Sequence, residues 1–175
     1  MDRQIRVGDS LAFGLRFRNS ETKAGSLVVE PFLFDAICYN LTTAYSTLEE
    51  EGEFTLRHVG DLSRRLPDIM ARAAAVIEPF VRKFGDAYKT PLPAQLPTRG
   101  DVLNRIEKVL ELPAEAVTLA SRLWDADGTS SAGDTLAGAA NALTRASQEL
   151  TMDVADVVEK AAGKLVGQGW DALLS

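Results

Sequence analysis

Two arginines, Arg16 and Arg18, are the residues of this sequence whose type and spacing most directly suggest chemistry. They alternate with Leu15 and Phe17. Because neighbouring residues of a β-strand point to opposite faces, this alternation predicts that both guanidinium groups share one face. Two such groups at this spacing are suited to binding successive phosphates of a nucleic-acid backbone. The candidate nucleic-acid-binding residues are Arg16, Arg18, Asn19 and Ser20, with Arg57 and His58 of a later segment.

A solvated polar face is the competing interpretation of these arginines. The chain has 19 basic and 25 acidic residues, which gives a net charge of -6 and a sequence pI of about 4.9. This balance argues against a protein held to nucleic acid by bulk positive charge, and it favours the solvated face. The acidic cluster at residues 49–53 is interpreted as a polar turn, with an acidic patch that mimics a partner as the alternative.

Catalysis needs convergent reactive side chains, and this chain has few of them. Cys38 and His58 are the single cysteine and the single histidine, so they form the one nucleophile pair that the sequence offers. A free cysteine on a core-facing stretch more often packs as a small hydrophobic residue. We therefore predict no catalytic residues and no covalent chemistry at Cys38.

Metal and nucleotide sites are also not expected. Asp125 and Asp127 resemble the start of a calcium loop, but the full pattern needs a further Asp or Asn, which Ser130 is not, and a Glu at the twelfth position, where Leu136 stands. Residues 133–138 lack the lysine and the hydroxyl residue of a phosphate-binding loop. One histidine and one cysteine cannot complete a zinc site without carboxylates. The prediction is a protein with no metal and no cofactor that is not an enzyme.

Composition indicates a globular protein with a sizeable core. The chain has 175 residues, of which 46% are hydrophobic and 25% charged, which is typical of folded soluble proteins. No run approaches the roughly 18 apolar residues that a membrane-spanning helix needs, and the first ten residues lack the apolar centre of a secretory signal. A lone cysteine cannot form an internal disulfide. We expect no membrane association and a location in a reducing cytoplasm.

The first sixty residues predict a small antiparallel sheet. Residues 11–18 alternate strictly between apolar and other side chains, and the β-branched run at 26–30 follows a polar turn, which together indicate a hairpin. Pro31 stands at a favourable first-turn position, and the apolar spacing after it predicts a short helix. A third strand is expected at 53–59. The apolar strand residues expected to be buried are Leu11, Phe13, Leu15 and Phe17.

From Asp61 onward the apolar period changes from 2 to 3.6, which predicts helices. Apolar residues recur every three or four positions from Leu62 to Tyr88, the pattern of one long amphipathic helix with a kink at Pro79. After the proline-rich segment 90–97 we expect about four helices, one of them capped by Thr98 or Asp101. The others cover the stretch from Pro113 to Trp124, from Asp134 to Leu150, and from Thr151 onward.

The predicted fold class is therefore α+β, with a small antiparallel sheet followed by a long kinked helix and a mostly helical C-terminal part. Residues 1–90 form the strand-bearing part and residues 98–175 the helical part, packed together as a single domain. The long apolar seam also predicts self-association through the long helix or the first strand, so a homo-oligomer is expected.

Five short segments taken together resemble the phage and plasmid-like proteins grouped as domain of unknown function 932. They include a Cys-x-Asn at Cys38 and Asn40, the Arg57-His58 pair and an Asn-Ala-x-Thr at Asn141 to Thr144. The segments lie in the family's order at 14–22, 27–34, 38–40, 56–61 and 141–144. Leu41 replaces a glycine that the family commonly carries. The resemblance implies a short or N-terminally truncated member that is encoded by a mobile genetic element.

This context favours two functions. The first is a non-enzymatic role in nucleic-acid metabolism, such as single-stranded DNA binding or an annealing-like activity, supported by Arg16 and Arg18. The alternative is an interaction protein that binds and modulates a host defence or restriction component, supported by the negative charge. The expected partners are thus single-stranded nucleic acid or a host protein, and the expected location is the cytoplasm of the host cell if the protein is phage-encoded.

Overall fold

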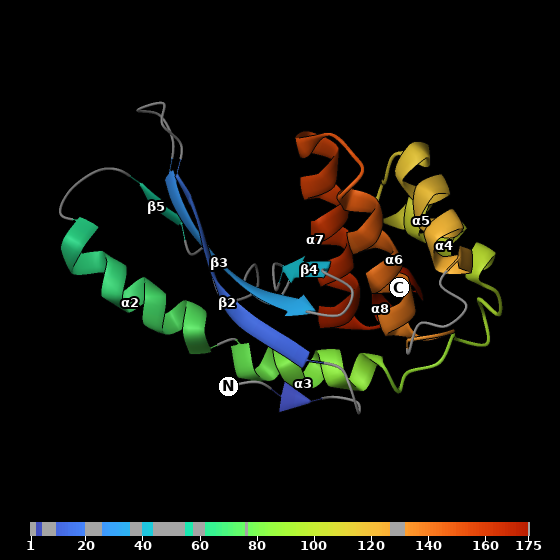
Figure 1. Cartoon of the computed structure of the whole chain (residues 1–175), viewed down its shortest axis with the longest axis horizontal. Helices are drawn as coiled ribbons and strands as arrows, with labels where there is room; N and C mark the ends of the chain where they lie inside the picture. The colour runs from blue at the N-terminus through green and yellow to red at the C-terminus, as the bar shows by residue number, and fades with distance from the viewer. Residues whose placement is uncertain are drawn as a thin grey trace.

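The structure is a computed structural model, and it describes residues 3–4, 10–19, 26–35, 40–43, 55–57, 62–75, 77–126 and 132–174. Its backbone places five strands before the helices (Figure 1). They are β1 (Arg3–Gln4), β2 (Ser10–Asn19), β3 (Ser26–Asp35), β4 (Asn40–Thr43) and β5 (Thr55–Arg57). All pairings are antiparallel: β1 pairs with β2, β2 with β3, and β3 with both β4 and β5 along its other side.

The short helix expected after Pro31 is wrong, because β3 continues through this residue to Asp35. A proline lacks the backbone N–H that a central strand uses for pairing, so its presence argued against a strand. The register explains why it is tolerated. On the side away from β2, β5 ends its pairing at Val28 and β4 begins at Phe32, so Pro31 lies in the gap between two partner strands.

The long helix expected from Leu62 to Tyr88 is two helices. Helix α2 (Leu62–Ala75) contains Pro67, and α3 (Ile77–Ala87) is a separate helix, while residue 76 lies outside the described residues. The kink predicted at Pro79 inside one long helix is therefore wrong. Pro79 is the third residue of α3, where the missing N–H would have had no partner within the helix.

The remaining described helices follow from Arg99 onward. They are α4 (Arg99–Val109), α5 (Ala114–Ala126), α6 (Leu136–Ser147), α7 (Met152–Gln168) and α8 (Asp171–Leu174). Thr98 caps α4: its hydroxyl accepts from the backbone N–H of Asp101, and the Asp101 carboxylate accepts from the backbone N–H of Thr98. Both residues proposed as caps thus act together in one capping box.

Helix α6 lies at the centre of the helical part. Eleven of its twelve residues are buried, and it packs against α5 and α7, with further contacts to α3 and α4. Its sequence is rich in alanine, so neighbouring helices can approach it closely from several sides. The main buried cluster extends from Phe80 on α3 to Leu173 on α8. Helices therefore supply this core.

The predicted α+β class is wrong. The part of the chain for which the structure describes side chains as well as backbone is about 75% helical and holds no sheet, so this part is mostly helical, and the strands given above are described almost entirely by their backbone. The physical reason is that the described apolar surface is buried mainly between helices and not on the sheet. Among described side chains, the main buried cluster contains no strand residue, and Val29 is the one strand residue found buried.

Figure 1 shows two regions, which we call the arm and the body. The arm consists of β2, β3, β5 and α2, and it extends to one side of the helices. The body consists of α3 to α8. Strand β3 contacts α2 and α3, and β4 contacts α6 and α7, so β4 connects the sheet to the body. The division at residues 90–97 into a strand-bearing and a helical part stays a prediction.

Candidate functional site

Four of the six candidate nucleic-acid-binding residues lie in described strands. Arg16, Arg18 and Asn19 belong to β2, and Arg57 is the last residue of β5. Ser20 and His58 lie outside the described residues. The backbone register therefore fixes the relative positions of the three arginines.

The register brings Arg57 to the same face of the sheet as Arg18. Arg18 is opposite Val28 on β3, and Val28 is opposite Thr55 on β5. Residues directly opposite each other share a face, and so do residues two apart along one strand. Because Arg57 follows Thr55 by two and Arg16 precedes Arg18 by two, all three arginine positions occupy one face, which we call the arginine face.

An acidic residue also belongs to the arginine face. Glu30 on β3 is directly opposite Arg16. An opposite-charge pair across two strands contributes roughly 0.2–1 kcal/mol to strand pairing. The face therefore holds three basic positions and one acidic position, and Arg18 and Arg57 are the two without an acidic residue directly opposite in the register.

The other face of the arm is only partly covered. Val29 is fully buried, whereas Phe17, which is directly opposite it in the register, is 47% exposed. The expectation that Phe17 is buried is thus wrong. Helix α2 contacts β3, so the cover is centred on the inner strand and β2 is left at its margin.

A basic segment that sequence reasoning missed follows the strands. Residues 62–89, which span α2 and α3, contain six basic and three acidic residues in a chain of net charge -6. Arg64, Arg65 and Arg72 are exposed on α2, with Asp68 among them. The apolar spacing of this stretch predicts only its buried seam, and the charge count of the segment is the signal for its solvent-facing side.

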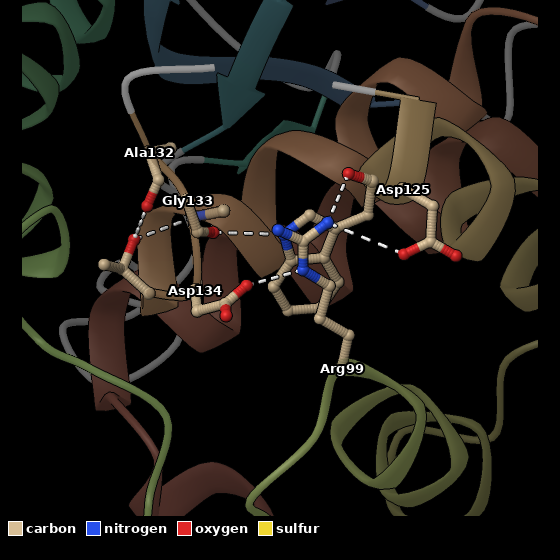
Figure 2. A network of polar contacts seen from close by, with 8 residues as sticks. Arg99, Asp125, Ala132, Gly133 and Asp134 are labelled. Carbon is tan, nitrogen blue, oxygen red and sulfur yellow. Dashed lines mark hydrogen bonds and ion pairs between the residues drawn. The ribbon is translucent and has the colours of Figure 1, made fainter. Parts of the chain in front are cut away.

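A polar network of the body is centred on Arg99, the first residue of α4 (Figure 2). Its Nε donates to Asp134 Oδ1 at 2.6 Å, and its Nη1 donates to the backbone oxygen of Trp124 at 2.6 Å. The same nitrogen lies 3.5 Å from Asp125 Oδ1. The guanidinium carbon is also 5.3 Å from the centre of the Trp124 ring, a distance typical of a cation–π contact.

This network joins the two ends of the loop between α5 and α6. Trp124 Nε1 donates to the backbone oxygen of Gly133 at 3.1 Å, and Gly133 has a positive φ of 51°. A methyl group at Gly138 would overlap that carbonyl oxygen and lie 3.0 Å from Trp124 Nε1. The loop can close this tightly on α6 because Gly138 has no side chain.

The Arg99 network is suited to holding a loop rather than to binding a cation. Its two described carboxylates, those of Asp125 and Asp134, both contact the same guanidinium group. No group of three potential metal ligands occurs among the described residues. Asp127 and Ser130, the other positions weighed for a calcium loop, lie outside them.

The Asn-Ala-x-Thr motif lies inside the body. Asn141 and Thr144 are 6% and 1% exposed on α6. The Thr144 hydroxyl is within hydrogen-bond distance of the backbone oxygens of Ala140 and Asn141. Asn141 Oδ1 is a buried acceptor without a hydrogen-bond partner, which costs stability. Within the described structure, these two residues therefore belong to the helical core and not to an exposed surface.

Cys38, the partner of His58 in the candidate nucleophile pair, lies outside the described residues, as His58 does. No described helix is long and apolar enough to cross a membrane. Comparison with protein families, curated proteins and solved structures found no match to this chain. The resemblance to domain of unknown function 932 thus stays a prediction that rests on the quoted segments alone.

Proposed function

We propose that this protein binds single-stranded nucleic acid without sequence preference, as a non-enzymatic protein of a mobile genetic element. The observation that carries the proposal is the register that places Arg57 on the face of Arg16 and Arg18. Three basic positions on adjacent strands offer contacts to successive phosphates, and phosphate contacts carry no sequence information. A cytoplasmic location is part of the same proposal.

The basic segment at residues 62–89 supports this proposal electrostatically. Its α2 half lies in the arm, where α2 contacts β3 from the face of Val29, opposite the arginine face, and its α3 half lies in the body. Residues 90–175 contain seven basic and twelve acidic residues. The elements of the arm, β2, β3, β5 and α2, contain six basic and three acidic residues, so they attract a polyanion more strongly than residues 90–175 do, even though the net charge of the chain is negative.

The test is the salt dependence of binding to a fluorescent single-stranded oligonucleotide, measured by anisotropy. Each phosphate contact on a single strand contributes about 0.7 to the slope of log affinity against log salt. The double variant Arg16→Ala/Arg18→Ala should weaken binding to all sequences alike and flatten this slope by about 1.4. Arg122→Ala is the matched control, because Arg122 is exposed on α5 in the body.

A second double variant sharpens the assignment. Arg18→Ala/Arg57→Ala removes one arginine from each of two strands and leaves the Arg16–Glu30 pairing position intact. It should flatten the slope as much as the first double variant does. If the Arg122→Ala control lowers affinity equally, or if the wild type does not bind at low salt, the proposal is wrong.

The acidic body favours the alternative function, binding to a host protein. Glu107, Glu111 and Glu115 lie around the α4–α5 turn, and none of them forms an ion pair with another described residue. Two results together would establish this function instead. The wild type would capture a host defence component that the variant Glu107→Gln/Glu111→Gln/Glu115→Gln does not capture, and the wild type would not bind nucleic acid.

A further inference from the structure

The outer edge of β2 has no partner strand over most of its length. On its inner side, β2 pairs with β3 from Leu11 to Asn19. On its outer side, β1 pairs only with Ser10 and Leu11. Among the described strands, residues 12–19 of β2 therefore have one side whose backbone donors and acceptors are unpaired.

Such an edge is a template for another strand. Natural sheets protect their edges with short strands, charged side chains such as lysine, prolines or a covering element. Residues 12–19 form a long edge with no lysine and no proline, and its two charged residues, Arg16 and Arg18, share one face, while the principal contacts of β2 are with β3 and β1. The 47% exposed side chain of Phe17 adds apolar surface at the same place.

We propose that this edge pairs with the same edge of a second copy of this chain, in antiparallel orientation around a two-fold axis at Leu15. In this register Leu15 is opposite Leu15 of the second copy, and Phe13 is opposite Phe17. Arg16 is opposite Gly14, and Arg18 is opposite Ala12. Apolar positions thus meet apolar positions, and each arginine meets a residue that carries no charge.

The neighbouring registers are less favourable. A two-fold axis perpendicular to the sheet keeps each face of the two copies on the same side. Paired residues then share a face, so their numbers differ by an even number and the axis passes through a residue position. An axis at Arg16 places Arg16 opposite itself, and an axis at Phe17 places Arg16 opposite Arg18; like charges directly opposite each other destabilise a strand pair. An axis at Gly14 pairs only residues 12–16 of the free edge. The axis at Leu15 pairs the most residues without an arginine opposite an arginine.

Pairing of this kind would make one continuous sheet with β3 and β5 of each copy on its two sides. The arginine faces of the two copies would then adjoin on one surface. This inference rests on the backbone edge and on the residue types along it, and it is independent of the nucleic-acid proposal.

The test is disulfide cross-linking in a Cys38→Ser background, with oxidised glutathione as the oxidant. Directly opposite Cα atoms in an antiparallel pair are about 4.5 or 5.5 Å apart, within the range of roughly 4.4–6.8 Å that a disulfide needs. The variant Leu15→Cys should therefore form a disulfide-linked dimer in most chains, even at low protein concentration.

Phe17→Cys is the matched control on the same strand. In the proposed register it lies four residues, about 14 Å along the strand, from the same position of the second copy, which is too far for a disulfide. Alone it should stay monomeric on a non-reducing gel. Mixed with Phe13→Cys it should give the mixed dimer.

Sedimentation velocity of the unmodified chain provides the second measurement. A species of twice the mass of one chain is expected, both with and without oligonucleotide. A monomer at high concentration, or equal cross-linking of Leu15→Cys and Phe17→Cys alone, would overturn the proposal. The Leu15→Glu variant, which places two like charges on the axis, should dissociate the dimer while circular dichroism retains the helical signal of the body.

Discussion

The body and the arm differ in how they bury apolar surface. In the body, six helices surround a cluster that extends from Phe80 to Leu173 and includes almost all of α6. In the arm, the described buried apolar residues are Val29 on β3 with Ile69 and Ala73 on α2. Since burial of apolar surface is the main favourable term in folding, the body should carry most of the stability, and the arm should open at a lower free-energy cost.

The largest expected effect is in the body. Phe84 is 1% exposed, and its ring lies edge-on to Tyr88 with 5.5 Å between the ring centres. Phe84→Ala should lower the free energy of unfolding by about 3–5 kcal/mol, because it leaves a cavity that the surrounding helices cannot fill. Urea denaturation followed by circular dichroism measures this loss. A loss below about 1 kcal/mol would contradict a closely packed body.

The second effect comes from the loop that closes on α6. Gly138→Ala should destabilise the protein by about 1–3 kcal/mol, since its methyl group would overlap the Gly133 carbonyl oxygen. Gly100→Ala is the control, because the nearest atom to its methyl group would be Thr98 Oγ1 at 3.7 Å. That control should be neutral or slightly stabilising, as alanine favours helix over glycine. Equal thermal midpoints for the two variants would argue against the close approach.

A third variant tests the arm alone. Ile69→Ala should lower the free energy of opening of α2 by about 2 kcal/mol, because Ile69 is only 6% exposed. Met70→Ala is the control for comparison, because the neighbouring Met70 side chain is 38% exposed. Native-state hydrogen exchange should show faster exchange in α2 and β3 for Ile69→Ala, with α6 unchanged. Faster exchange throughout the body would show that arm and body unfold as one unit.

The smallest expected effect separates two helix caps. Thr98→Ala removes a side-chain bond to the N–H of Asp101 and should cost about 1 kcal/mol. Thr151 is the N-cap residue of α7, but its side chain makes no cap hydrogen bond. Thr151→Ala should therefore lower the free energy of unfolding by only a few tenths of about 1 kcal/mol. The difference between the two denaturation midpoints is the measurement. Equal losses would mean that the threonines act through something other than capping.

The sequence predicted local features well where one residue type has one physical role. Thr98 and Asp101 were named as caps from their side chains, and they form the capping box. Pro31 was misinterpreted because its tolerance in β3 depends on where two other strands end, which is a property of the whole sheet. The role of Pro79 was misinterpreted because the apolar spacing runs continuously from Leu62 to Tyr88 and does not show that α2 and α3 are separate helices, with Pro79 in the first turn of α3.

The fold class and the candidate site depended on information that local patterns lack. Alternation predicted that Arg16 and Arg18 share a face, but the position of Arg57 on that face depends on the register of β5 against β3. Likewise, a strict apolar alternation did not show that Phe17 would lie at the uncovered margin of the arm. The predicted fold class was wrong because most of the buried core comes from alanine-rich helices such as α6.

Three side chains fasten the C-terminal part of the body to earlier elements. Lys83 donates to the Gly167 oxygen at 2.8 Å, Arg105 to the Leu173 oxygen at 2.7 Å, and the Trp170 indole to the Pro91 oxygen at 2.8 Å. During synthesis the ribosome adds roughly 5–20 residues per second. The arm therefore emerges several seconds before the residues that complete the body. Over that interval all residues of the β2–β3 pair are already synthesised, and under the edge pairing proposed above, neighbouring ribosomes on one messenger would bring two β2 strands close together.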